Sequence, residues 1–261
     1  MGYIDFFGKQ IPSYGLCFVA GIAMSACVAA GLIKKRKIAG IDLTGSAVYT
    51  MVGAIVGAKL LFIIVSWEQI QAYNLSFLDV LRGGFVFYGG LIGGVAGLFI
   101  YIKQFKLKLA DFLDIYATVL PLGHAIGRIG CFFSGCCYGM KMSTNCFLCV
   151  TYEHPQNALT PQGVPLLAIQ LIEAFFLFLC FLLMLTLFLK AHKLKGRLAY
   201  MYACVYAILR FILEFFRGDK ERGGAFRLST SQWISLGILI LMSAIWIISY
   251  KKEKRSYNEG N

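Results

Sequence analysis

The sequence predicts an all-α integral membrane protein with about seven transmembrane helices, the N-terminus outside and the C-terminus in the cytoplasm. Hydrophobic residues make up 59% of the 261 positions and charged residues only 15%, and the mean hydropathy is +0.71. A soluble domain of this length has too small a core to bury so much apolar surface. Several runs of about 20 residues are almost free of charge, which is the length that a helix needs to cross roughly 30 Å of hydrocarbon.

Each apolar run is expected to be a helix, because hydrocarbon offers no hydrogen-bond partner to backbone amides and carbonyls. The first run is long, and its basic cluster follows it rather than preceding it, which is typical of a retained span and not of a cleaved signal peptide. The expected spans are 11–32, 45–66, 84–102, 109–127, 164–189, 198–216 and 230–250.

The net charge of +12 is explained by membrane topology. With the N-terminus outside, the inner loops and tail hold 15 of the 25 Lys and Arg residues, and the outer segments hold eight. Cytoplasmic loops carry such an excess of positive charge. No basic stripe is interleaved with stacking aromatic rings, so we expect a lipid bilayer and no nucleic acid as a partner.

No internal repeat or linker divides the chain, so a single polytopic domain over residues 1–261 is expected. Within it, residues 128–163 contain five cysteines and are expected to form an ordered cysteine-rich lobe on the outer side. Residues 218–228 are charged and contain glycine, and are expected to be a mobile outer cover. Residues 251–261 are expected to be a solvated cytoplasmic tail.

Three charged residues near the outer end of the sixth expected span share one helix face. Arg210, Glu214 and Arg217 follow the spacing i, i+4, i+7, which brings their side chains together. Two guanidiniums beside one carboxylate form a fork that fits phosphate oxygens. Ionisable residues inside transmembrane helices commonly mark substrate paths, which makes Arg210 the main functional candidate. The alternative is an ion network that only packs helices.

Two further groups lie on the fourth and fifth expected spans. His124 and Arg128 are spaced i, i+4 and precede a glycine-rich stretch, where the backbone can approach an anionic lipid headgroup. The alternatives are a packing histidine and an arginine that snorkels to the interface. Gln170 and Glu173, spaced i, i+3, are candidates to orient an arginine across the bundle.

The second and third expected spans carry two more candidates. Lys59 lies in the outer half of its span, where a buried ammonium is a functional candidate by default. Tyr88 begins the run Tyr88-Gly-Gly-Leu-Ile-Gly-Gly94. The glycines allow close helix contact, which alone would explain the run. The phenol would bind phosphate or assist proton transfer, or it is one more interface tyrosine.

The outer lobe carries Cys131, Cys136, Cys137, Cys146 and Cys149. The oxidising outer compartment favours disulfides, while a Cys-x-x-Cys pair with further thiols also suits Zn²⁺. A thiolate beside a positive charge would be a nucleophile, because such neighbours lower the pKa of a thiol. Small packing residues are the remaining interpretation, and no metal ligand set is assigned.

Several of these residues lie in motifs that resemble those of the prolipoprotein diacylglyceryl transferase family, over most of the chain. The matching segments, in order, are Pro12-Ser-Tyr-Gly-Leu16, Gly57-Ala-Lys-Leu60, Gly127-Arg-Ile-Gly130, Gln170-Leu-Ile-Glu-Ala174 and Arg210-Phe-Ile-Leu-Glu-Phe-Phe-Arg217, followed by Gln232.

The resemblance implies transfer of a diacylglyceryl group from phosphatidylglycerol to the lipobox cysteine thiol of a preprolipoprotein, with release of glycerol 1-phosphate. It implies no cofactor, and a place in the bacterial plasma membrane with the active site open to the outer leaflet. Arg128 and Arg210 would hold the phosphate. The remaining candidates are Tyr88 and His124 for catalysis, Glu214, Arg217, Tyr14, Lys59, Glu173 and Gln170 for substrate binding, and Cys131, Cys136 and Cys137 on the acceptor side or in a structural role.

The sequence departs from the family pattern at four polar positions. Tyr88 stands where the family usually has histidine, Cys131 and Ser134 stand where it has asparagine, and Cys136 stands where it has glutamate. Tyrosine is a poor base at neutral pH, so His124 is a candidate replacement base. The departures also leave open a paralogous transferase with another acceptor or lipid donor, or a non-catalytic lipid-binding or redox membrane protein.

Overall fold

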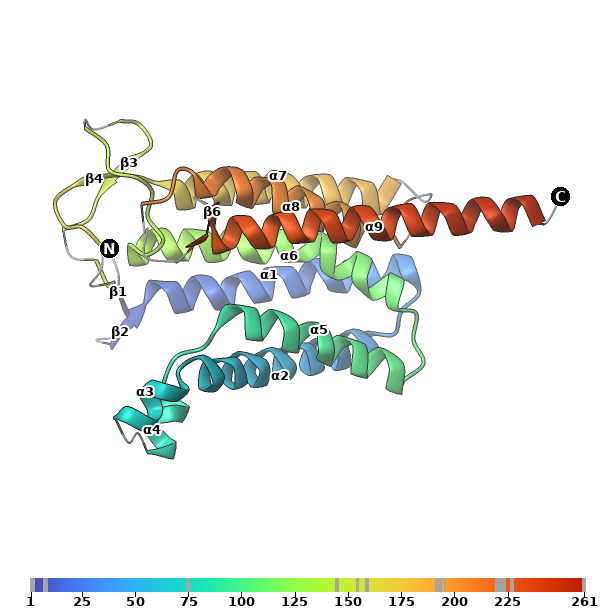
Figure 1. Ribbon diagram of the computed structural model, residues 1–261, viewed down its shortest axis with the longest axis horizontal. Helices are drawn as coiled ribbons and strands as arrows, with labels where there is room; N and C mark the ends of the chain where they lie inside the picture. Colours follow the sequence, from blue (N-terminus) through green and yellow to red (C-terminus); the bar gives the residue numbers. More distant parts are fainter. Residues whose placement is uncertain are drawn as a thin grey trace. The chain divides into compact units, whose positions relative to one another are not determined.

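Long helices make up most of the computed structural model of the chain (Figure 1). The structure describes residues 3–6, 9–73, 76–143, 146–153, 155–157, 160–190, 194, 196–218, 224–225 and 228–259. The chain divides into two units, one of residues 1–29 with 113–261 and one of residues 30–112. Helices α1 and α6 continue from one unit into the other.

The unit of residues 30–112 is built on one close helix pair. It contains α2 (Gly40–Val65), α3 (Trp67–Ala72), α4 (Phe77–Arg82) and α5 (Phe87–Gln104). Gly53 and Gly57 of α2 face Gly89 and Gly93 of α5 so closely that a Cβ at any of the four would run into the backbone of the other helix. Small residues allow this approach between helices in lipid, so the glycine run after Tyr88 forms a helix contact.

The larger unit carries the remaining elements. They are β1 (Tyr3–Phe6), β2 (Lys9–Pro12), α1 (Ser13–Arg36), α6 (Leu109–Ser134), β3 (Cys149–Thr151), β4 (Pro165–Leu167), α7 (Ile169–Lys190), α8 (Leu198–Glu214), β5 (Gly224–Ala225), β6 (Leu228–Ser229) and α9 (Thr230–Glu259). The strands form three antiparallel two-stranded pairs, β1–β2, β3–β4 and β5–β6. Helix α7 packs on α8, and α8 packs on α9.

Polar contacts fix the helices of this unit against one another. Ser25 of α1 donates a hydrogen bond to the Val119 carbonyl of α6 at 3.2 Å. Asp114 of α6 is fully buried and accepts the backbone N–H groups of Gly196 at 2.6 Å and Leu198 at 3.1 Å. The carboxylate therefore caps the first turn of α8, where a helix has N–H groups without intrahelical partners.

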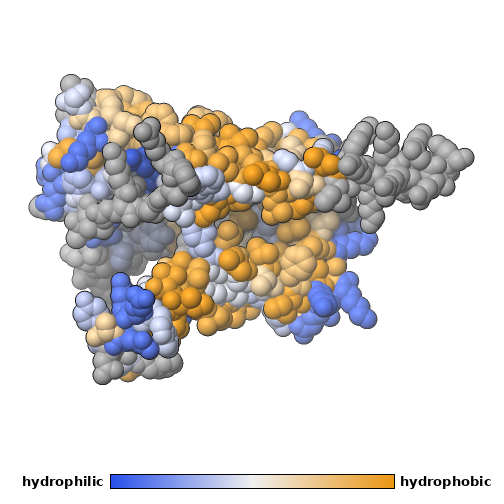
Figure 2. All heavy atoms as spheres, viewed as in Figure 1, coloured by the Kyte–Doolittle hydropathy of each residue, from blue (hydrophilic) through white to orange (hydrophobic). Residues whose placement is uncertain are grey.

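Five of the described helices are long and apolar enough to cross a membrane: α1, α2, α6, α7 and the Thr230–Ile247 part of α9. Helices α5 and α8 have 18 and 17 residues, or about 25–27 Å at 1.5 Å per residue. Large apolar side chains are exposed along many of the helices. On the face seen in Figure 2, hydrophobic side chains cover the middle of the helices and hydrophilic ones gather toward their ends.

Several boundaries differ from the expected ones. Helix α6 continues to Ser134, so Arg128 and Cys131 lie on a helix and not in the lobe expected over residues 128–163. The glycines that favoured a loop are tolerated because a close neighbour packs there: Gly130 faces Cys17 of α1. Helix α9 runs through the expected tail to Glu259. Most of the expected cover at 218–228 lies outside the described residues.

Replacing Gly93 by alanine is expected to weaken the α2–α5 pair, because the new Cβ would strike the Gly53 carbonyl. Overpacking of this kind costs about 1–3 kcal/mol. Thermal unfolding in detergent measures the loss. Gly94→Ala is the matched control, since a Cβ there meets Ala54 Cβ at 3.5 Å, an ordinary contact. Equal melting temperatures for the two variants would contradict the packing described.

Candidate active site

Arg128 of α6 is held by a buried carboxylate of α7. Its Nε lies 3.0 Å from Glu173 Oε1 and donates to His124 Nε2 at 3.3 Å. Glu173 is 1% exposed, and its Oε1 is also 3.9 Å from His124 Nε2. The pairing matches the expectation that Glu173 orients an arginine from another helix. The geometry fixes the guanidinium and neutralises its charge in an apolar bundle.

Gln170 lies nearly one turn before Glu173 on α7 and is equally buried. It makes a different contact from the one expected. Its Nε2 donates to the Cys136 carbonyl at 2.8 Å, so it fixes the turn that follows α6 and does not touch an arginine in the hydrogen bonds described.

A second arginine–glutamate pair lies at the end of α8. Arg210 Nη2 is 2.7 Å from Glu214 Oε2 and donates to Ser231 Oγ of α9 at 3.2 Å. Arg210 is 9% exposed, and among the described residues its buried Nη1 has no hydrogen-bond partner. Buried donors are nearly always satisfied in folded proteins, so an Nη1 in this state is well placed to bind an anionic ligand.

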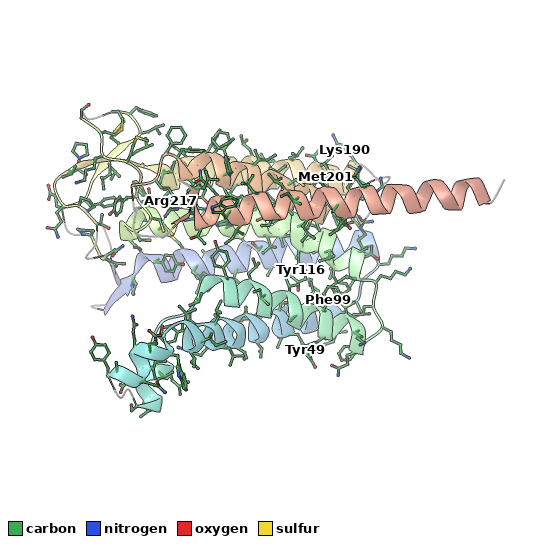
Figure 3. The ribbon with its side chains drawn as sticks, viewed as in Figure 1. Tyr49, Phe99, Tyr116, Lys190, Met201 and Arg217 are labelled. Atoms are coloured by element: carbon green, nitrogen blue, oxygen red, sulfur yellow. A yellow bond between two sulfur atoms is a disulfide. The ribbon has the colours of Figure 1, made fainter. Side chains whose placement is uncertain are left out.

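Arg217 lies beyond the helix, although the sequence predicted that it would share one helix face with Arg210. Helix α8 ends at Glu214, and Arg217 Nε remains within 3.9 Å of Glu214 Oε2. The lobe holds this segment: Arg217 forms a β-bridge with Gly139, and Gly218 donates its N–H to the Tyr138 carbonyl at 3.0 Å. Figure 3 shows Arg217 at the β3–β4 end of its unit and Lys190 at the opposite end.

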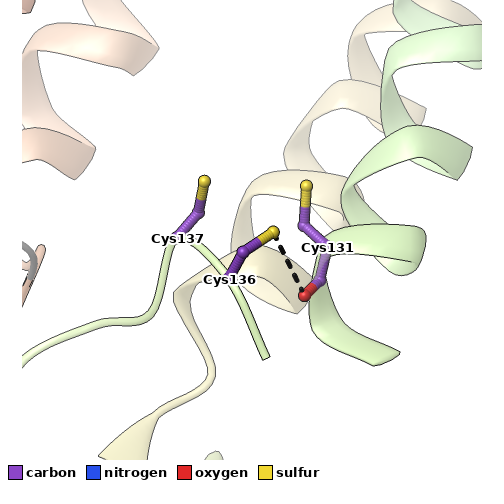
Figure 4. Close-up of side chains that lie close together, drawn as sticks. All are labelled: Cys131, Cys136 and Cys137. Atoms are coloured by element: carbon purple, nitrogen blue, oxygen red, sulfur yellow. Dashed lines mark hydrogen bonds between the residues drawn. The ribbon is translucent and has the colours of Figure 1, made fainter. Parts of the chain in front are cut away.

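The five cysteines that the sequence placed in the outer lobe divide into a pair and a cluster. Cys146 and Cys149 form a disulfide. The sulfur atoms of Cys131, Cys136 and Cys137 lie within 4.8 Å of one another, at the end of α6 and in the turn that follows (Figure 4). Hydrogen bonds from the Cys131 and Cys136 thiols lower the pKa of Cys137, and Arg217 acts in the same direction.

Two tyrosines border this region. Tyr14, at the start of α1, is 44% exposed and lies against Gly130 of α6. Tyr152 donates its hydroxyl to the Phe132 carbonyl at 2.8 Å. Burial raises the pKa of the Tyr152 phenol, so this group stays a neutral donor that supports the turn after α6.

Lys59 and Tyr88 belong to the other unit. Lys59 Nζ donates to the carbonyls of Val80 and Leu81 at 3.1 Å, Gly83 at 3.0 Å and Gly84 at 3.1 Å, and it lies 4.2 Å from the centre of the Phe85 ring. It therefore stabilises the C-terminal end of α4. Tyr88 is the second residue of α5 and is partly buried.

Helix α4 is fixed at its other end by Ser76. The Asp79 N–H donates to Ser76 Oγ at 3.3 Å, and the Ser76 N–H donates to Asp79 Oδ2 at 3.1 Å, which is a capping box. The Ser76 hydroxyl also donates to Asp79 Oδ2 at 2.6 Å, and this hydrogen bond, together with that from the Ser76 N–H, lowers the pKa of Asp79. A group with a lowered pKa stabilises the fold above its unfolded pKa, and that contribution is lost as the pH falls through the folded value.

Sequence reasoning missed two residues of the arginine network. Tyr206 lies with its ring centre 5.3 Å from that of His124, and Ser231 accepts from Arg210. The signal for Tyr206 was present, because it precedes Arg210 by one helical turn. Ser231 gave none, since a serine in the first turn of a helix is common. Gln232, matched by the family motif, accepts the Ser229 N–H at 2.9 Å and caps α9.

Residues 3–248 match the family model described as prolipoprotein diacylglyceryl transferase. The chain belongs to the prolipoprotein diacylglyceryl transferase family. It is 34% identical over 259 residues to phosphatidylglycerol–prolipoprotein diacylglyceryl transferase 2 of Clostridium perfringens, covering 98% of this chain and 97% of the relative. A similarly named relative from Clostridium tetani is 34% identical over 237 residues, covering 91% and 92%. One from Finegoldia magna is 33% identical over 247 residues, covering 95% and 94%.

Three of the positions at which the sequence is expected to depart from the family pattern lie close together in the chain. Cys131, Ser134 and Cys136 all lie at or just beyond the end of α6, and Ser134 donates to the Gly130 carbonyl at 3.0 Å. The family motifs that carry Arg128, Glu173 and Arg210 meet in the same unit. The charged residues of these motifs and the thiol-rich turn therefore belong to one unit of the chain.

Replacing Lys59 by methionine is expected to destabilise the protein rather than weaken lipid binding directly. Hydrogen bonds to a charged group contribute about 1.5–3 kcal/mol, so the melting temperature should fall by several degrees, with the KM for phosphatidylglycerol unchanged in the folded fraction. Lys103→Met, at an exposed position of α5, is the control. An unchanged melting temperature together with a raised KM would instead assign Lys59 to substrate binding.

Proposed function

We propose that this protein is a phosphatidylglycerol–prolipoprotein diacylglyceryl transferase of the bacterial plasma membrane. It moves the diacylglyceryl group of phosphatidylglycerol onto the lipobox cysteine thiol of a preprolipoprotein and releases glycerol 1-phosphate. Family membership and relatives that carry this name over nearly their full length support the activity. The main structural support for the site comes from Arg210. Its buried guanidinium pairs with Glu214 through Nη2, while Nη1 has no hydrogen-bond partner among the described residues.

The proposed arrangement in the membrane is a single domain of seven spans, with the N-terminus outside and the active site open to the outer leaflet. The excess of Lys and Arg in alternate loops supports this orientation. The larger unit supports the same orientation. Arg217, from an expected outer segment, lies at the end that carries β3 and β4, and Lys190, from an expected inner loop, lies at the opposite end. A lipid headgroup in the outer leaflet would then lie at the level of the arginines.

The reaction is a displacement at the glyceryl carbon. The acceptor sulfur forms a bond to this carbon while the bond between the carbon and the phosphate ester oxygen breaks. The electron pair of the broken bond leaves with glycerol 1-phosphate. The thiol proton is lost before or during the attack. The phosphate gains one negative charge, and Arg128 and Arg210 would stabilise that charge in the transition state. Arg217 and the two glutamates would hold the guanidiniums in position.

His124 has a place in this scheme that differs from that of a base. Its Nε2 accepts a hydrogen bond from Arg128, so that lone pair is already used. We propose that His124 positions Arg128. The alternative is that His124 acts as the base, in place of the histidine that the family usually has at the position of Tyr88.

A second transferase with another acceptor or lipid donor is the competing proposal. The departures at Tyr88, Cys131 and Cys136 favour it, because they fall on the side of the reaction that handles the thiol. A non-catalytic lipid-binding or redox protein is a third candidate, and it would not need Arg210 for turnover.

The direct test follows phosphatidylglycerol and a lipobox peptide in nanodiscs, with peptide mass and glycerol phosphate as readouts. Arg210→Ala is expected to lower kcat/KM by about 100-fold or more, as for loss of one donor to a developing oxyanion. Lys190→Ala, at an exposed end of α7, should retain activity. Glycerol phosphate release without peptide modification would favour another acceptor, and turnover that survives Arg210→Ala would contradict the proposed site.

Replacing His124 by glutamine separates a positioning role from that of a base. The amide oxygen of glutamine can still accept the Arg128 N–H, so turnover should stay within about 10-fold of wild type, whereas His124→Ala should lose more. The pH profile of kcat/KM should be the same for wild type and His124→Gln. A glutamine variant as inactive as the alanine variant, with a changed acid limb of the profile, would identify His124 as a proton acceptor.

A further inference from the structure

Three thiols, those of Cys131, Cys136 and Cys137, lie close together beside the arginines. The Cys131, Cys136 and Cys137 sulfur atoms lie within 4.8 Å of one another, and none of the three is in a disulfide. Cys146 and Cys149, the other two cysteines of this region, form a disulfide with each other. Figure 4 shows the three side chains close together at the end of α6 and in the turn after it, with the Cys136 thiol donating to the Cys131 carbonyl at 3.8 Å.

The backbone of this turn is held in an uncommon conformation. Cys137 has φ of 58° and Gly135 has φ of 75°. A left-handed non-glycine residue costs of order 1–3 kcal/mol and persists where the surroundings impose it. The surroundings here are Gln170, which donates to the Cys136 carbonyl at 2.8 Å, and Thr160, which donates to the Gly135 carbonyl at 2.9 Å. The turn is thus braced so that two adjacent cysteines face a third.

Three thiol ligands suit a thiophilic metal ion and leave one of its four coordination positions open. Zinc–thiolate bonds of about 2.3 Å place tetrahedral sulfur ligands about 3.8 Å apart. Each sulfur–sulfur distance would therefore have to shorten by at most about 1 Å for the cluster to close around the ion, which side-chain rotation can supply. Three thiolates on Zn²⁺ carry a net charge of −1. Arg128 interacts electrostatically with Cys131 and Arg217 with Cys137, so positive charge is at hand to offset it.

We infer that Cys131, Cys136 and Cys137 bind a zinc ion through three thiolates, and that the fourth position takes the acceptor thiol of the transferase reaction. The inference rests on the proposed function for the identity of that thiol. Zinc-binding sites with three protein ligands keep the fourth for water or substrate, and a coordinated thiol is deprotonated. The cluster would thereby supply the thiolate that Tyr88 is poorly suited to generate.

The step balances without any redox change. The acceptor thiol displaces water from the ion and loses its proton to solvent, giving a zinc-bound thiolate. Its sulfur then forms a bond to the glyceryl carbon as the carbon–oxygen bond breaks, and glycerol 1-phosphate leaves with the electron pair. The product is a neutral thioether, a weak zinc ligand, so it is released and water returns.

Metal analysis of the purified full chain tests the site. We expect about one zinc ion per chain after dialysis, as for a tight three-thiolate site, and a loss of most of it in Cys131→Ser, Cys136→Ser and Cys137→Ser. Cys27→Ser, an exposed cysteine of α1, should retain the metal. Zinc far below one equivalent in wild type, or a disulfide within the cluster found by alkylation and mass spectrometry, would overturn the inference.

Cobalt substitution of the wild-type protein avoids reliance on variants that fail to fold. Co²⁺ should give thiolate charge-transfer absorption, and a lipobox peptide should change the spectrum, while its cysteine-to-serine analogue should not. A cobalt spectrum that the thiol peptide leaves unchanged would overturn substrate coordination. Transfer activity that persists after complete zinc removal would overturn the inference while leaving the proposed function intact. A peptide response without any transfer would support the zinc site and contradict the function.

Discussion

The pairing of each buried arginine with a buried glutamate is the constraint on which the rest of the site depends. An isolated guanidinium in an apolar bundle carries a desolvation penalty of several kcal/mol. Glu173 lies 3.0 Å from Arg128 and Glu214 lies 2.7 Å from Arg210, so each cation is carried with its own anion. One pair joins α6 to α7, and the other lies at the end of α8, next to α9. The same contacts that hold the helices therefore aim the guanidiniums.

The outer lobe completes this arrangement by fixing what lies beyond the helix ends. The bridge between Gly139 and Arg217 places the third arginine against Glu214, and Gln170 anchors the turn of Cys136. Arg217, a residue of the proposed phosphate site, and the thiol cluster thus depend on the same short segment. A change in that segment would affect both sides of the proposed reaction, the phosphate that leaves and the thiol that arrives.

Much of the fold was predictable, because long apolar runs in lipid can only be helices. Each expected span contains a long helix, and the family named from the motifs is confirmed by the comparisons. The partnership of Glu173 with an arginine followed from spacing and burial cost.

The end of α6 could not be predicted in this way, because glycines favour a loop in isolation. Here Gly130 packs against Cys17, and the helix continues through it. The structural role of Lys59 could not be predicted either, since the carbonyls it binds belong to residues 21–25 positions further along the chain. The division of five cysteines into a disulfide and a cluster depends on the turn at Cys137, which no local pattern specifies.

The affinity of the purified protein for glycerol 1-phosphate, measured by calorimetry in wild type and in Arg210→Ala, tests the central claim most directly. The claim is that the glutamate-held arginine binds the phosphate. It predicts that the folded variant binds at least about 10-fold more weakly, the loss of one charge-assisted contact. Equal affinity in the two folded proteins would contradict it.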